Sequence, residues 1–165
     1  MAARRSYEES CRVRGRDPVP RLGRRPSFDA AEGEDWFHSQ TTGEDLRDLT
    51  MPHLALGRAL VEDTRFDNTD LSQSLLNWSD FIRVSFAGAD LHDSDLRNST
   101  FEGCDFTGAA LDGCDLRCSQ FAGCGFDGAS LRGATLTEAQ RKSLPLSAEQ
   151  RQATITDTED DAPGG

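Results

Sequence analysis

The hydrophobic positions of this chain recur every five residues through its middle part. Every fifth residue is Phe or Leu at Phe66, Leu71, Leu76, Phe81, Phe86, Leu91, Leu96, Phe101, Phe106, Leu111, Leu116, Phe121, Phe126, Leu131 and Leu136. The residue two places before each of them is small, with Val84 the one larger member. Neither a helix nor a flat strand has this period. A fixed period instead predicts a solenoid, in which each unit buries its apolar side by stacking on the next.

The large positions also sort by residue type when they are taken every twenty residues. Two columns are aromatic, one starting at Phe66 and the other at Phe81 below Val61. Two columns are leucine, starting at Leu71 and Leu76. A five-residue period alone does not require this sorting, but a coil with four sides that stacks like on like does. We therefore expect four five-residue units per coil, each with one large and one small side chain pointing inward.

The units resemble a known repeat. Residues 89–93, 104–108 and 114–118 spell ADLHD, CDFTG and CDLRC, which are similar to the A(D/N)LXX repeat of the pentapeptide-repeat family. The resemblance covers about half of the chain. It implies an all-β solenoid, a right-handed quadrilateral β-helix, here of about five coils. Some members of that family are DNA mimics that protect DNA gyrase or topoisomerase IV from quinolones or natural gyrase poisons, and this chain is similar to them.

The segments before the repeats differ from them in composition. Residues 1–30 are predicted to be a disordered basic tail, because eight arginines face three acids up to residue 27 and few large apolar residues accompany them. Residues 31–60 keep Leu46, Met51 and Leu56 on the five-residue grid but lose most of the small partners. We expect an irregular first coil or N-terminal cap there, followed by the β-helix at 61–136.

Two helix signals follow the last repeat. Thr137 with Gln140, and Ser147 with Gln150, each fit a capping box. They predict short helices near 138–143 and 148–154 in a helical C-terminal cap that spans 137–156. Residues 157–165 are predicted to be a disordered acidic tail.

Charge and hydrophobicity limit the compartment and the classes of partner that we expect for this protein. The net charge of −11 argues against direct nucleic-acid binding. No apolar run is long enough to span a membrane, and the apolar stretch of a signal peptide is missing after the first arginines. We therefore expect a cytoplasmic protein without a membrane partner.

Catalytic and metal-binding patterns are weak. Cys104, Cys114 and Cys124 occupy small inward positions, where cysteine behaves as a compact hydrophobe, and the paired ligands of a zinc site are missing. The three histidines have no nucleophile at a suggestive spacing. We expect no enzyme activity, no metal and no cofactor.

Acidity is the more informative feature. Residues 61–140 hold fourteen acids and five arginines, a net charge of −9. Over four coils, or about 19 Å, this approaches the roughly 11 charges of duplex DNA of that length. Partner-binding candidates are the outward acids of the two most negative walls: Asp70, Asp90, Asp93 and Asp112, and Glu62, Asp63, Asp80 and Glu102. The charge suits solubility as well as mimicry, and the sequence leaves both open.

A second candidate surface is apolar. Leu75, Trp78 and Ile82 fall at positions that should face solvent. Such a cluster marks a contact, either with Trp36, Phe37 or the cap of the same chain, or with a partner protein. The family resemblance implies gyrase or topoisomerase IV as such a partner, and a homodimer through the C-terminal cap.

Overall fold

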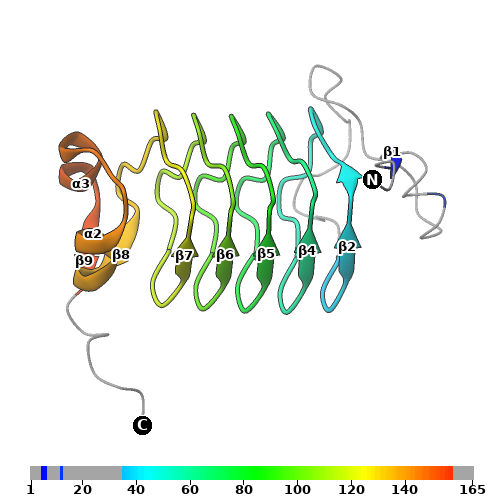
Figure 1. Cartoon of the computed structure of the whole chain (residues 1–165), viewed down its shortest axis with the longest axis horizontal. Coiled ribbons are helices and arrows are strands. Elements are labelled where there is room, and N and C mark those ends of the chain that lie inside the picture. Colours follow the sequence, from blue (N-terminus) through cyan, green and yellow to red (C-terminus); the bar gives the residue numbers. More distant parts are fainter. Residues whose placement is uncertain (1–4, 7–11, 13–34, 158–165) are drawn as a thin grey trace, which may run out of the picture.

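The chain winds as a right-handed, four-sided β-helix that is closed at its C-terminal end by two short helices (Figure 1). This computed structural model describes residues 5–6, 12 and 35–157. Both expected tails therefore lie almost wholly outside the described residues. The predicted fold class is confirmed.

Successive coils pair with a constant offset of twenty residues. One wall is a parallel five-stranded sheet in the order β2-β4-β5-β6-β7, with the bounds β2 Gln40–Thr42, β4 Leu60–Glu62, β5 Asp80–Ile82, β6 Thr100–Glu102 and β7 Gln120–Ala122. Its register joins Phe81 to Phe101 and Phe101 to Phe121. The other walls pair through isolated bridges with the same offset, such as Asp70 to Asp90.

Phenylalanine rings form the centre of the core. Along one column the ring centroids of Phe86 and Phe106 lie 5.1 Å apart and nearly parallel, and along the next column those of Phe81 and Phe101 lie 4.9 Å apart. Rings of adjacent columns meet edge to face, as do Phe101 and Phe106 at 5.5 Å. Each such pair adds about 0.5–1.5 kcal/mol beyond the burial of its area. The predicted aromatic columns are thus confirmed.

Serines at the small inward positions link successive coils by hydrogen bonds, except Ser39 of the first coil, whose buried hydroxyl has no partner among the described residues. The hydroxyl of Ser79 donates to the carbonyl of Leu56 at 2.5 Å and accepts from the backbone N–H of Ala59 at 3.0 Å. Ser99 repeats this pattern one coil later with the carbonyl of Leu76 and the N–H of Ser79. Buried serines are tolerated here because each one links two coils.

Every unit turns its corner in the left-handed region of backbone space. From residue 38 to residue 133, every fifth residue has a positive φ, and eight of these twenty corners are glycine. The glycines that recur two places after the large residue stand at these corners, for example Gly128 (φ +67°). The other twelve corners hold side chains, Trp78 and Arg83 among them, at a conformational cost on the order of 1 kcal/mol each.

The backbone of the first coil is more regular than its sequence suggested. Among the described residues of the segment 31–60, β2 pairs in register with β4, and β3 (Glu44–Asp45) pairs in parallel with β1 (Arg5–Ser6). What departs from the repeat is the filling of the interior, because Leu49 and Leu54 occupy small positions and Trp36 is buried.

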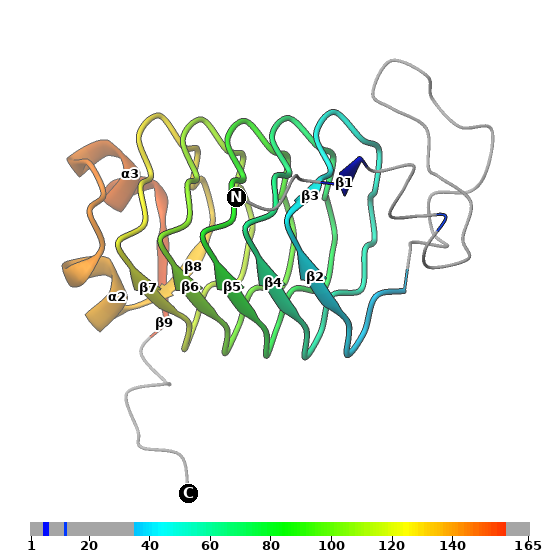
Figure 2. The same ribbon diagram turned by 45° about the vertical axis from the view of Figure 1, so that its right-hand side comes forward.

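The C-terminal cap consists of β8 (Thr135–Thr137), α2 (Glu138–Ser143), α3 (Ala148–Ala153) and β9 (Ile155–Asp157), with β9 parallel to β8. Figure 2 shows both helices lying across the end of the coil. Each helix begins with the predicted capping box. The two predicted helices are confirmed within a residue of their expected ends.

Candidate functional site

Each wall of the solenoid presents its own set of outward side chains. We name the walls by their inward columns: wall A contains Phe66, wall B Leu71, wall C Leu76 and wall D Phe81. Outward positions lie one residue before the large residue and one and two residues after it. The walls therefore differ in charge although they share one backbone.

Wall D carries four candidate acids on its five-stranded sheet. Asp63 forms an ion pair with Arg83 one coil later, with Nε to Oδ1 at 2.7 Å. Glu62, Asp80 and Glu102 have no arginine or lysine partner among the described residues. The net charge of this wall is −3 between residues 61 and 140.

Wall B lies opposite wall D and holds the other four acids. Asp90 binds His92 through Oδ1 and Nδ1 at 2.6 Å, and this hydrogen bond raises the pKa of His92 above its ordinary value. Asp112 accepts from the backbone N–H of Arg132 at 2.9 Å and pairs with its guanidinium at 3.3 Å. Burial opposes ionisation of Asp112, but the Ser130 hydroxyl and Arg132 outweigh it and lower the pKa. Asp70 and Asp93 lie on the same wall, so the structure brings all four candidates together.

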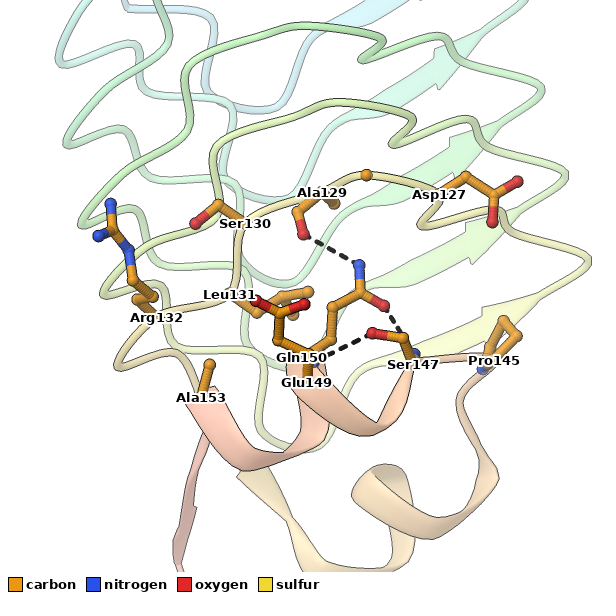
Figure 3. A pocket seen from close by; sticks show the side chains of 11 residues that line it. Asp127, Ala129, Ser130, Leu131, Arg132, Pro145, Ser147, Glu149, Gln150 and Ala153 are labelled. Carbon is orange, nitrogen blue, oxygen red and sulfur yellow. Dashed lines mark hydrogen bonds between the residues drawn. The ribbon is translucent and has the colours of Figure 1, made fainter.

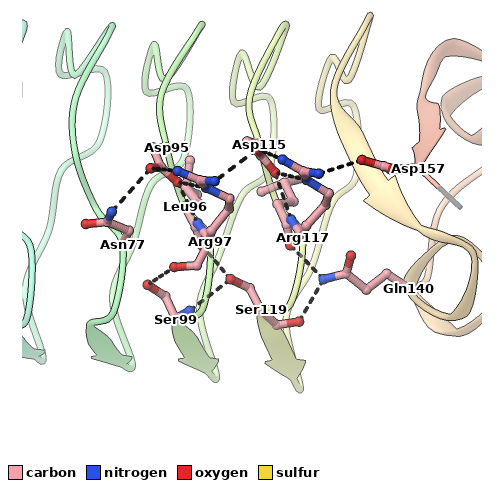
Figure 4. Close-up of polar contacts among 11 residues, drawn as sticks. Asn77, Asp95, Leu96, Arg97, Ser99, Asp115, Arg117, Ser119, Gln140 and Asp157 are labelled. Atoms are coloured by element: carbon pink, nitrogen blue, oxygen red, sulfur yellow. Dashed lines mark hydrogen bonds and ion pairs between the residues drawn. The ribbon is translucent and has the colours of Figure 1, made fainter. Parts of the chain in front are cut away.

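Wall C is the neutral wall, because its acids and arginines alternate along the axis (Figure 4). Asp95 lies between the Asn77 amide at 3.2 Å and Arg97 at 2.9 Å. Asp115 continues the row by contacting Arg97 at 3.6 Å and Arg117 at 2.8 Å. The Asp95 carboxylate is half-buried, which opposes ionisation, yet the bonds from Arg97 hold its pKa below the usual value. Arg117 also pairs with Asp157 of β9 at 2.5 Å and so fastens the cap to the coil.

The apolar candidates do not form an internal contact within the described part of the chain. Leu75 is 52% exposed and Trp78 is 60% exposed, whereas Ile82 is partly buried. Trp36, expected as a possible cover, is instead in the core at 2% exposure. Phe37, the other expected cover, is itself 53% exposed and stacks on His38. The expectation that Trp36 or Phe37 covers the patch is therefore wrong, because Trp36 occupies the inward position twenty residues before Leu56 and the Phe37 ring lies against Gly57.

The cysteines and histidines do not assemble a reactive centre where the structure can be described. Burial raises the pKa of the Cys114 thiol to about 12, so it is a neutral core residue. No cluster of three or more His, Cys, Asp or Glu side chains that could hold a metal ion occurs among these residues. No helix in the described ranges is long and apolar enough to cross a bilayer.

A cavity of about 510 Å³ lies between the last coil and α3 (Figure 3). Asp127, Arg132 and Glu149 are its charged lining residues, and neither histidine nor cysteine lines it. The amide of Gln150 spans its floor by donating to the carbonyls of Phe126 and Ala129 at 2.7 and 2.9 Å. This hydrogen bonding closes the end of the backbone ladder, and the lining offers no nucleophile paired with a base.

Sequence reasoning missed Arg58, at the corner of wall C, and Ile155, on wall C itself. Arg58 lies one coil from Trp78, whereas Ile155 lies four coils from Leu75. Ile155 is 56% exposed and belongs to the same column as Leu75, as the pairing of Thr135 with Ile155 shows. Continuing the twenty-residue count into the cap, from 75 to 155, was the signal that could have found it.

Comparison with protein families identifies the repeats. The family model for pentapeptide repeats matches with eight copies over residues 64–103 and 104–140. The chain belongs to the pentapeptide-repeat family. None of the curated proteins matches it.

Solved structures share the fold. HetL, a pentapeptide repeat protein involved in heterocyst differentiation regulation from the cyanobacterium Nostoc sp. strain PCC 7120, aligns with a TM-score of 0.58 at 19% identity. The alignment covers 61% of this chain and 48% of HetL, so this chain spans about half the length of that protein. A pentapeptide repeat protein of the Arabidopsis thaliana thylakoid lumen aligns at 18% identity over 79% of this chain and 81% of its own, with a TM-score of 0.47.

QnrB1, a plasmid-mediated fluoroquinolone resistance protein, aligns at 18% identity over 61% of this chain and 69% of its own, with a TM-score of 0.28. At these identities the likeness concerns the fold alone. Function has to be argued from the walls themselves.

Proposed function

We propose that the protein is a non-enzymatic binding module whose walls B and D present a rigid acidic surface to another macromolecule. One observation carries this proposal, namely the unequal pairing of charges on the walls. On wall C the acids Asp95 and Asp115 are matched by Arg97 and Arg117. On walls B and D most carboxylates do not form an ion pair with an arginine of the described residues. If the acids served solubility alone, there would be no need for paired acids on wall C and unpaired acids on walls B and D.

The fold makes such a surface well suited to binding. Outward positions repeat at about 4.8 Å from coil to coil, and their backbone is held by hydrogen bonds on both sides. Carboxylates on a rigid frame lose little conformational entropy when a partner binds, and a negative wall speeds the approach of a cationic surface. The partner expected from this chemistry carries arginines or lysines along a flat or grooved face.

The alternative function is DNA mimicry that protects gyrase or topoisomerase IV from quinolones or natural gyrase poisons. The −9 charge of residues 61–140 supports it. Five coils span about 24 Å, or about seven base pairs, so a mimic would be longer if two copies joined end to end. The cap buries Leu144 and Leu146 at 5% exposure and exposes Ile155. This gives little apolar area for a homodimer through the cap. A gyrase partner would place the protein in the cytoplasm.

Charge removal on one wall tests the main proposal. The variant Glu62→Gln/Asp80→Asn/Glu102→Gln removes the three unpaired charges of wall D. Its matched control, Asp48→Asn/Asp105→Asn/Asp127→Asn, removes three exposed acids from wall A. We expect crosslinking in cells to capture a partner with wild type and control, and about tenfold less with the wall D variant. Equal capture by all three proteins, or no partner, would overturn the proposal for wall D, and Asp70→Asn/Asp93→Asn repeats the test on wall B.

Supercoiling by purified gyrase, with and without a quinolone, tests the alternative. A mimic inhibits supercoiling or relieves poisoning at micromolar concentration, and the wall D variant loses this effect. No change with wild-type protein would remove the gyrase hypothesis while leaving the acidic module intact.

A further inference from the structure

Three of the four exposed large hydrophobic residues of the described chain lie in neighbouring coils at one end of wall C. The four residues are Phe37, Leu75, Trp78 and Ile155. Leu75 and Ile155 belong to one column of wall C, Phe37 to the neighbouring column, and Trp78 to the corner between walls C and D. Ile155 lies four coils from Leu75 and is a single exposed residue, whereas the grouping of Phe37, Leu75 and Trp78 indicates a contact surface.

The same corner holds an arginine for which the described residues offer no acidic partner. Between residues 35 and 136 the chain has seven arginines. Six of them form ion pairs with aspartate: Arg47, Arg65, Arg83, Arg97, Arg117 and Arg132. The guanidinium of Arg58 has no carboxylate within 4.0 Å among the described residues, and its side chain is exposed. In a chain with a net charge of −11, an unpaired arginine beside exposed aromatic residues is unexpected.

Arg58 lies between aromatic side chains in successive coils. The corner positions of three coils are His38, Arg58 and Trp78, as the bonds from His38 N–H to Gly57 and from Arg58 N–H to Asn77 show. These three residues line an open groove of about 610 Å³, and its other lining residues, Ser39, Gln40, Ala59, Leu60 and Asp80, belong to wall D. The groove therefore lies over the corner and the adjoining part of wall D, and it offers one cation, an indole, an imidazole and a single acid.

Electrostatics determines which partner can approach this corner. The outward charges of wall C cancel in the row from Asp95 to Arg117, whereas walls B and D each carry −3. A negatively charged segment is repelled by the acidic walls but not by wall C, and at Arg58 it finds a planar guanidinium that binds a carboxylate through two parallel hydrogen bonds. Trp and Arg are also the residues most enriched at the energetic centres of protein interfaces.

We propose that the Arg58 corner binds a segment of a partner protein in which a carboxylate lies next to an aromatic or aliphatic side chain. Arg58 holds the carboxylate, and Trp78 with Leu75 and Phe37 covers the apolar side chain. This inference goes beyond the acidic module, because it uses the corner between walls C and D and a partner of opposite charge. A protein with both surfaces joins a cationic partner to an acidic-apolar one.

A set of three short peptides tests the proposal with the full-length protein. The probe is a fluorescein-labelled eight-residue peptide with the central sequence Glu-Leu-Phe, and its matched controls carry Gln-Leu-Phe and Glu-Ser-Ser. Fluorescence anisotropy gives the affinities. We expect the Glu-Leu-Phe peptide to bind at least about tenfold more tightly than either control, a difference of about 1.4 kcal/mol. Trp78 emission should change on binding, since the other tryptophan, Trp36, is buried.

Variants at one corner and at an equivalent corner separate the site from general charge effects. Arg58→Gln should lower the affinity at least about tenfold, and Arg58→Lys should restore part of it. Trp78→Asn also removes the apolar cover while keeping a residue that tolerates a positive φ. The control is Arg83→Gln, since Arg83 also occupies a corner, at φ +53°, but is paired with Asp63.

The proposal is overturned if the Glu-Leu-Phe peptide does not bind at about millimolar concentration, or if Arg58→Gln and Arg83→Gln weaken it equally. Backbone amide shifts that map the peptide to wall A or wall B, to wall D beyond Asp80, or to a contact between two copies of the chain, would also overturn it. Thermal unfolding of every variant confirms that a lost affinity is not lost folding. Failure here leaves the wall D charge test untouched.

Discussion

The side-chain amide of Gln140 donates to the carbonyl of Ser119 at 2.8 Å, where earlier coils use a backbone N–H. In the coil before, the backbone N–H of Gln120 donates to the carbonyl of Ser99. The same amide reaches the carbonyl of Leu116 at 2.6 Å, a bond that a serine hydroxyl makes elsewhere (Figure 4). One glutamine thus supplies both donors that the next coil would have supplied, and Gln150 does the same for Phe126 and Ala129.

Loss of this amide should destabilise the whole solenoid. Gln140→Ala leaves two buried carbonyls and the N–H of Thr137 without partners, which costs about 2–4 kcal/mol. Gln152→Ala is the matched control, because Gln152 is exposed on the neighbouring helix. Urea unfolding measures both variants. If Gln140→Ala is no less stable than the control, the amide does not terminate the ladder as described.

Substitution by alanine should lower the stability of the protein at Gly128 and raise it at Gly125, three residues earlier. Gly128 stands at a corner with φ +67°, and no atom lies within 4 Å of an added Cβ. The cost of Gly128→Ala is therefore conformational and on the order of 1 kcal/mol. Gly125 is equally uncrowded but does not have a positive φ, so Gly125→Ala should stabilise by about 0.4–1 kcal/mol. Melting temperatures that fall equally in both variants would contradict the assignment of strain to the corner.

Truncation of a central ring should be costly. Phe106 is fully buried and stacks on Phe86 and Phe126 at 5.1 Å. Phe106→Ala should lower the free energy of unfolding by about 3–5 kcal/mol. The exposed neighbour Thr107 provides the control, since Thr107→Ala should change it by less than about 0.5 kcal/mol. If Phe106→Ala lowers the free energy of unfolding only slightly, the neighbouring side chains must move into the space that the ring leaves.

His92 should titrate above the ordinary histidine pKa. Its hydrogen bond to Asp90 favours the imidazolium in the folded state, so the stabilisation is complete below about pH 6.5 and is lost as pH rises through the folded pKa. Asp90→Asn should lower the pKa measured by NMR titration of the ring protons. An unchanged pKa in that variant would exclude Asp90 as the cause. Protonation also reduces the negative charge of wall B, so a cationic partner of that wall should bind less tightly at low pH.

The interior of this protein could be predicted because its code is strictly local. One large and one small residue per unit fix which side chains point inward, so the columns through Phe66, Phe81, Leu71 and Leu76 follow from counting. The cap helices were equally accessible, because Thr137 and Ser147 each precede a glutamine at the capping-box spacing. What counting could not show is that Gln140 reaches back to bind another coil.

The outer surface was harder to predict, because outward residues obey no repeat. The acids of walls B and D were assigned to the correct walls, since wall membership follows the same count. Their pairing was not, because it depends on whether an arginine such as Arg83 or Arg97 lies within reach along the axis or the turn. Trp36, in contrast, lies on the same grid, because it is twenty residues before Leu56, and continuing the count into the first coil would have placed it in the core.

Because every coil pairs with the next at an offset of twenty residues, the number of coils in this rod can change while its two ends stay the same. Because Gln140 and Gln150 contact main-chain carbonyls, the cap recognises the shape of a coil and not its sequence. A duplicated copy of residues 101–120, inserted after residue 120, would lengthen the rod by about 4.8 Å and leave both termini as they are. Evolution can therefore add or delete whole turns to match the span of a partner, and each added turn brings outward positions whose charge is free to vary.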